Sequence, residues 1–157
     1  MSTERPEGWQ SEPDDPDLAD SPDSTHHSEA TFLLVIALGG ALGTAARYAA
    51  GLAWPTSAAA FPGTTLAINV AGCALMGVLM VLVTERFAAP ALLRPFLGTG
   101  VLGGFTTFST YAVDAERLFR LDATTSAVLS LALTLVLAVV ALWGAARTTR
   151  ALLGRTA

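Results

Sequence analysis

Four long apolar segments constrain the fold of this chain more than any other feature of the sequence. They cover residues 31–52, 64–84, 91–117 and 124–143. An α-helix needs about 20 residues to cross the hydrocarbon core of a membrane, and a backbone surrounded by lipid must bond its own polar groups, as a helix does. The sequence therefore predicts an all-α integral membrane protein with four transmembrane helices, in a membrane domain of residues 29–150.

The composition supports a membrane protein and argues against an enzyme. Hydrophobic residues make up 52% of the chain and charged residues 14%, whereas about 25% of residues are charged in a typical soluble domain. The connections between the apolar segments are too short to form a soluble catalytic domain. The apolar segments contain no histidine and one cysteine, Cys73, and they show no serine–base pair or metal-binding spacing. We therefore expect no enzymatic activity.

Charge is distributed unevenly along the chain. Residues 1–29 contain nine acidic residues and one arginine, a net charge of −8, whereas residues 30–157 contain eight arginines and four acidic residues, a net charge of +4. Residues 1–28 have too few aliphatic side chains to form a core, so they are predicted to be a disordered acidic tail. Residues 151–157 are predicted to be a short C-terminal tail. Because the arginines gather at the ends of apolar segments, nucleic acid is not an expected partner.

The arginines also predict an orientation. Four crossings place both termini on one side of the membrane. The arginines on that side are Arg5, Arg86, Arg94, Arg147, Arg150 and Arg155. Arg117 and Arg120 lie on the opposite side, and Arg47 lies near the end of the first segment. The positive-inside rule therefore favours cytoplasmic termini.

The third segment is a poor continuous helix. It contains five Ser and Thr residues between Phe96 and Tyr111, and four glycines, Gly98, Gly100, Gly103 and Gly104. Each interior glycine costs about 1 kcal/mol relative to alanine. We expect a break at Gly103 and Gly104, where freed backbone groups would bind an ion. The alternative is close helix packing through small residues.

Three motifs carry a resemblance to a known family. They are GGALGTAARY at residues 39–48, GTTLAINVAG at 63–72 and GGFTTFSTY at 103–111. In this order and spacing they resemble the CrcB/Fluc fluoride ion channel family, over about residues 31–147. The resemblance implies a small four-helix subunit in an antiparallel dimer, with two fluoride pores and a structural sodium ion, Na+, at the dimer centre. It also implies passive fluoride export across the cell membrane, the bacterial inner membrane, which lowers cytoplasmic fluoride and its toxicity.

The resemblance assigns ion-binding roles in the second and third segments. The main-chain carbonyls of Gly103 and Thr106 would hold the sodium ion, which is not transported. Phe108 and the residue three positions later would turn ring edges toward fluoride, and that later position is Tyr111 here, where the family has phenylalanine. The added hydroxyl either donates to fluoride or obstructs the path. Asn69 matches the pore asparagine of the family, and the alternative is a hydrogen bond between helices.

Further residues are assigned by position or by spacing. Ser126, Ser130 and Thr134 recur every four residues. This stripe of three hydroxyls resembles the polar track of the family's pore, with Ser130 and Thr134 as the expected pore residues, unless the hydroxyls bond the carbonyl four residues back. Arg47 matches a vestibule arginine that attracts anions, and the alternative is an arginine that reaches for water. Phe105 is expected to share a helical face with Phe108, and the alternative is ordinary packing.

Four glycines are expected to allow close helix contact rather than to touch an ion: Gly39, Gly43, Gly72 and Gly77. Two other functions stay open. A small-cation or drug exporter would need a carboxylate embedded in the membrane. A non-conducting or half-active subunit would complete a heterodimer with a paralogue. The expected partners are thus fluoride, membrane lipid and a second subunit, identical or paralogous.

Overall fold

The computed structural model describes residues 28–86 and 90–154. The predicted acidic tail, up to residue 27, lies outside the described residues, as do residues 87–89 and 155–157. Within the described ranges every regular element is a helix.

Three helices are long and apolar enough to cross a membrane in the described part of the chain. They are α1 (Glu29–Ala53), α2 (Gly63–Val81), which continues through the π-helical turn η2 (Leu82–Arg86), and α5 (Thr124–Gly154). They correspond to the first, second and fourth predicted segments. The last helix extends beyond the predicted end at Trp143, so most of the expected C-terminal tail is helical.

The third crossing consists of shorter pieces. The π-helix η3 (Pro95–Leu102) leads into α3 (Gly103–Phe105), and after residues 106–108 the chain resumes as α4 (Ser109–Arg120). Thr106 has an extended backbone, with φ −73° and ψ 161°. The break was expected at Gly103 and Gly104, and that position is wrong by about three residues. Both glycines are still helical, because the chain leaves the helix only where a side chain of α2 captures its backbone, as described below.

The predicted close contacts through glycine are confirmed. A Cβ atom built on any of the four glycines would lie 2.0–2.5 Å from an atom of a neighbouring segment; these are Gly39, Gly43, Gly72 and Gly77. At Gly43 that atom is the carbonyl oxygen of Val101, at 2.0 Å. Only glycine allows such an approach of two backbones.

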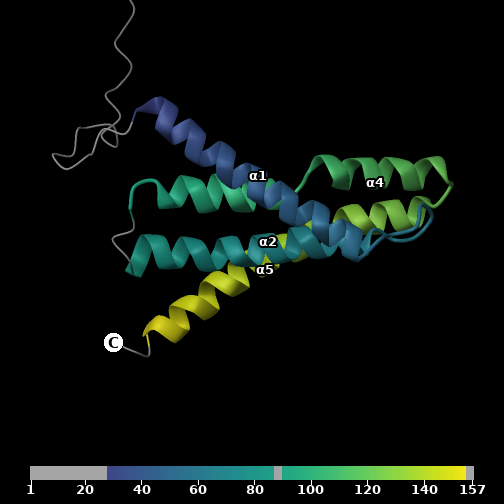
Figure 1. Cartoon of the computed structure of the whole chain (residues 1–157). Helices are drawn as coiled ribbons and strands as arrows, with labels where there is room; N and C mark the ends of the chain where they lie inside the picture. The colour runs from purple at the N-terminus through teal and green to yellow at the C-terminus, as the bar shows by residue number, and fades with distance from the viewer. Residues whose placement is uncertain (1–27, 87–89, 155–157) are drawn as a thin grey trace, which may run out of the picture.

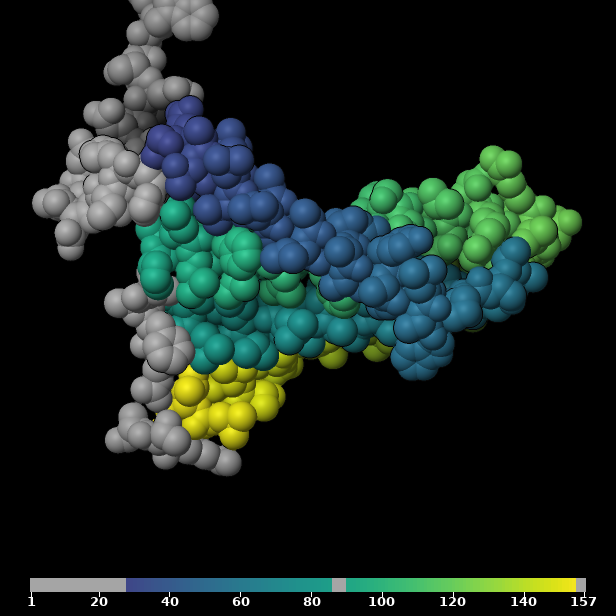
Figure 2. Space-filling model, viewed as in Figure 1, coloured from purple at the N-terminus to yellow at the C-terminus, as the bar shows by residue number. Residues whose placement is uncertain are grey.

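The two halves of the third crossing pack against different helices. The half before the break, η3 and α3, packs mainly against α1, and α4 packs mainly against α5. Figure 1 shows the start of α1 and the end of α5 at one end of the elongated molecule, and the α1–α2 and α4–α5 connections at the other. In the same view α1 crosses in front of the broken segment (Figure 2). This arrangement agrees with four crossings and with both termini on one side.

Apolar side chains cover the outside of the molecule. Leu33 is 66% exposed and Leu135 64% exposed, and many other large apolar residues are similarly open. Lipid chains are as apolar as leucine, so such a surface is stable inside a membrane.

Candidate functional site

An open groove of about 550 Å³ between α2, the break and α5 brings together six of the eight predicted site residues. They are Asn69, Gly103, Thr106, Phe108, Tyr111 and Thr134. These residues come from three segments that are far apart in the sequence. The groove is the candidate site.

Asn69 connects α2 to the break. Its side chain is buried, its Nδ2 donates to the carbonyl oxygen of Thr107 at 3.0 Å, and its Oδ1 accepts from the N–H of Thr107 at 2.8 Å. The predicted alternative for Asn69, a hydrogen bond between segments, is therefore present. The amide has two N–H groups, and one bond to Thr107 uses one of them. Asn69 also lines the groove.

The same contact frees a carbonyl group on the groove side. In a continuous helix the N–H of Thr107 would donate to the carbonyl of Gly103, four residues back. It donates to Asn69 instead, so the Gly103 carbonyl loses its usual helical donor. No group of three or more His, Cys, Asp or Glu residues gathers in the described chain. Main-chain oxygens, which suit a hard cation, are thus the donor set that fits a sodium ion here.

Two aromatic rings lie together after the break. The ring centroids of Phe108 and Tyr111 are 5.6 Å apart with an interplanar angle of 50°. Phe108 is 80% exposed in the single chain. The hydroxyl of Tyr111 donates to the carbonyl of Leu131 in α5 at 2.9 Å. The hydroxyl proton is therefore used in a hydrogen bond to a neighbouring helix.

Phe105 does not share a face with Phe108, contrary to the expectation for a continuous helix. The extended backbone of Thr106 lies between them and interrupts the helix. The Phe105 ring packs against Gly72 of α2, where an added Cβ would lie 3.2 Å from its Cδ1. Its role is packing, the other interpretation of this residue.

The hydroxyl residues of α5 differ from one another. Thr134 is buried and lines the groove. Ser130 is also buried, but its Oγ donates to the carbonyl of Ala127 at 2.8 Å, three residues back. That bond keeps the Ser130 hydroxyl within its own helix, as the alternative for these residues proposed. Ser126 is half-buried.

Arg47 lines a second cavity of about 310 Å³ on the α1 side of the break. Its Nε donates to the carbonyl of Gly104 at 3.1 Å. The guanidinium therefore contacts the broken segment instead of reaching only for water.

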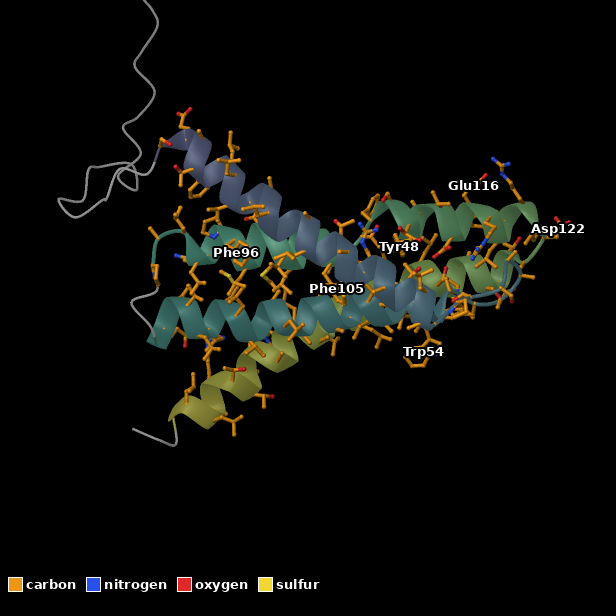
Figure 3. The ribbon with its side chains drawn as sticks, in the orientation of Figure 1. Tyr48, Trp54, Phe96, Phe105, Glu116 and Asp122 are labelled. Atoms are coloured by element: carbon orange, nitrogen blue, oxygen red, sulfur yellow. The ribbon has the colours of Figure 1, made fainter. Side chains whose placement is uncertain are left out.

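A charged cluster in the second cavity was missed by sequence reasoning. Asp114 accepts a hydrogen bond from the Thr65 hydroxyl at 2.6 Å and pairs with Arg117 at 3.1 Å. The spacing of the two charged residues, three positions apart on a helix, was a readable signal. Thr65 lies in the first turn of α2, so this carboxylate lies near the end of the segment. Glu116 and Asp122 lie still farther toward this end (Figure 3).

A model of the protein family described as "CrcB-like protein, Camphor Resistance (CrcB)" matches residues 34–146. The chain belongs to the CrcB-like family. The match covers most of α1, all of α2, the whole broken crossing and most of α5. Together with the three helices of membrane-spanning length, it makes this CrcB-like chain a multi-pass membrane protein.

Three relatives of this CrcB-like chain carry a functional name. "Fluoride-specific ion channel FluC 1" of Streptomyces coelicolor is 52% identical over 126 residues, which are 80% of this chain and 82% of the relative. "Fluoride-specific ion channel FluC 2" of Streptomyces avermitilis is 58% identical over 95 residues, 60% of each chain. "FluC 3" of the same organism is 51% identical over 86 residues, 55% of this chain and 42% of the relative.

Proposed function

We propose that this chain is a subunit of a fluoride-specific channel that lets fluoride leave the cytoplasm passively and so lowers its toxicity. The observation that carries the proposal is the groove, which gathers residues from α2, the break and α5 in a chain whose relatives are named fluoride channels. Permeation makes and breaks no covalent bond, so no catalytic residue is needed.

The groove offers what a small, strongly hydrated anion requires. An aromatic ring has a positive edge, and Phe108 and Tyr111 supply two rings within 5.6 Å of each other. The Asn69 amide and the Thr134 hydroxyl add hydrogen-bond donors along the groove. These groups replace the water molecules around fluoride. None of them carries a full positive charge, which would bind the ion too tightly for it to pass.

A second subunit would close the groove. Phe108 is 80% exposed in the single chain. A ring edge that binds an anion in a narrow pore needs further protein atoms on the other side of the ion. We propose an antiparallel dimer in which the Gly103 and Thr106 carbonyls of both subunits hold a structural sodium ion. When bound, the cation would neutralise carbonyl dipoles that the break releases.

The vestibule role proposed for Arg47 is supported by its cavity. A permanent positive charge in a recess raises the local concentration of anions. Asp114 lines the same cavity, but its carboxylate is paired with Arg117, so it adds little net repulsion.

The groups just described favour a channel over a cation or drug exporter. Such an exporter needs a membrane-embedded carboxylate that is free to take up a proton. Asp114 is held by Arg117 and by the Thr65 hydroxyl, and Glu85 is paired with Arg150 at 2.7 Å.

A subunit of a heterodimer is the second candidate. One observation favours it: the arginines predict a single orientation, and one orientation cannot form an antiparallel homodimer. The two FluC relatives of Streptomyces avermitilis support the idea that organisms carry more than one such chain. A half-active subunit would still contribute its own groove.

Fluoride efflux from liposomes tests the proposal. The purified protein is reconstituted into vesicles loaded with potassium fluoride or potassium chloride, and valinomycin is added so that potassium follows the anion. Fluoride should leave rapidly and chloride far more slowly. Equal release of both anions would contradict the channel assignment. Removal of residues before Ser28 should leave the flux unchanged, because the described residues that line the groove come from α2, the break and α5.

A further inference from the structure

The carbonyl of Gly104 is held by α1. It accepts a hydrogen bond from Arg47 Nε at 3.1 Å and a longer one from the Thr44 hydroxyl at 3.4 Å. The backbones are close here, because a Cβ on Gly104 would lie 2.4 Å from the carbonyl oxygen of Gly40. α1 thus presents a charged donor to the last turn before the break.

This contact fixes the direction of neighbouring backbone groups. Successive residues of a helical turn lie on different sides of the helix. Here the Gly104 carbonyl faces α1, and Gly103 lines the groove. A hydrogen bond from a guanidinium is stronger than one between neutral groups. Holding Gly104 against α1 therefore keeps Gly103 turned toward the groove.

The broken segment is restrained from two sides. On one side Arg47 holds Gly104, and on the other side Asn69 holds Thr107. The residues between these anchors carry the extended backbone of Thr106. Loss of Arg47 would leave the Gly104 carbonyl with the longer bond from Thr44, and loss of Asn69 would remove the partner of the Thr107 N–H and carbonyl.

We infer that Arg47 is a positioning residue for the break, in addition to any effect of its charge on anions. This inference rests on the proposed channel function. Its guanidinium acts through the Gly104 carbonyl, and the groove residues on both sides of the break depend on that contact for their placement.

The two roles of Arg47 make different predictions. A vestibule charge raises the local fluoride concentration, so its loss can be offset by more fluoride. A positioning residue changes the pathway itself, so its loss lowers flux at every fluoride concentration and loosens the backbone of the break.

Two neutral variants separate the roles. Arg47→Gln removes the charge but keeps an N–H donor, and Arg47→Met removes both at similar length. Hydrogen–deuterium exchange of residues 104–110 is measured on the full chain in lipid nanodiscs, and fluoride efflux is measured from low to high fluoride. We expect exchange of these amides to be about tenfold faster in Arg47→Met, which loses the hydrogen bond to Gly104 altogether, and much closer to wild type in Arg47→Gln, which keeps a neutral donor.

Arg120→Met is the matched control, because it removes a charge from the exposed end of α4, where Arg120 pairs with Glu116. It should change neither the exchange of the break nor the flux. Equal exchange in Arg47→Met and Arg47→Gln, with flux restored in both at high fluoride, would overturn the positioning role, and so would failure of both variants to fold. If only Arg47→Met fails to fold, the donor is essential and the inference is supported. The exchange result also stands if the wild-type protein passes no fluoride, so the two proposals can fail separately.

Discussion

The side chain of Asn69 bonds both the N–H and the carbonyl of Thr107, a residue 38 positions later in the chain. A helix break in a membrane leaves backbone groups without their usual partners, at a cost of several kcal/mol each. One amide side chain offers both a donor and an acceptor, so it satisfies both groups of one residue. Asn69 therefore stabilises the break as well as lining the groove.

Asn69→Asp should lower both stability and fluoride flux. One carboxylate oxygen can still accept from the Thr107 N–H, but the other replaces the donor that faces the Thr107 carbonyl. An unsatisfied buried group costs about 1–3 kcal/mol, and an ionised carboxylate repels fluoride. Thermal unfolding and liposome efflux measure the two effects. Undiminished flux would place Asn69 outside the ion path.

Phe108→Ile should abolish fluoride flux and leave dimer assembly intact. The substitution removes the ring edge but keeps an apolar side chain at an exposed position of the single chain. Efflux and size-exclusion chromatography are the measurements. Phe119→Ile is the control, because this ring is also exposed but lies near the far end of α4. Normal flux in the Phe108 variant would contradict the role of its ring.

Tyr111→Phe should keep the flux or raise it. The hydroxyl donates to Leu131, so its loss should cost about 0.5–1.5 kcal/mol of stability, while the ring beside Phe108 remains. Efflux and thermal unfolding, compared with wild type, measure both effects. If conduction stops, the hydroxyl is a required donor to the ion.

Gly43→Ala should destabilise the protein by about 1–3 kcal/mol, since overpacking forces neighbouring backbone to move. The new Cβ would lie 2.0 Å from the Val101 carbonyl oxygen. Gly51→Ala on the same helix is the matched control, because a Cβ there meets no atom within 4 Å. Thermal unfolding in detergent compares the pair, and equal melting temperatures would contradict the close contact of α1 and η3.

The arginine distribution predicts mostly cytoplasmic termini. A single cysteine is placed near the N-terminus in a Cys73→Ala background, and intact cells are treated with a membrane-impermeant thiol reagent. We expect protection in most molecules. A near-equal split between protected and labelled chains would rule out the heterodimer argument and favour a homodimer that inserts both ways.

Much of the fold was readable from the sequence because lipid imposes a simple rule on helix length and polarity. The four segments follow from that rule, and the glycine contacts follow from the close helix packing that small residues allow. The position of the break does not, because it depends on Asn69 reaching Thr107. Likewise, no local pattern predicts that Arg47 bonds Gly104, 57 residues away. The expectation that Phe105 shares a face with Phe108 requires a helix that continues between them, and the break at residues 106–108 interrupts it.

The break also divides the third crossing mechanically. Before it, η3 and α3 pack mainly against α1, and after it, α4 packs mainly against α5. A continuous helix would transmit a tilt along its whole length as a rigid rod. Here the two halves belong to separate packing units joined by the non-helical residues 106–108, so the third crossing consists of two shorter rods, one packed mainly on α1 and one mainly on α5.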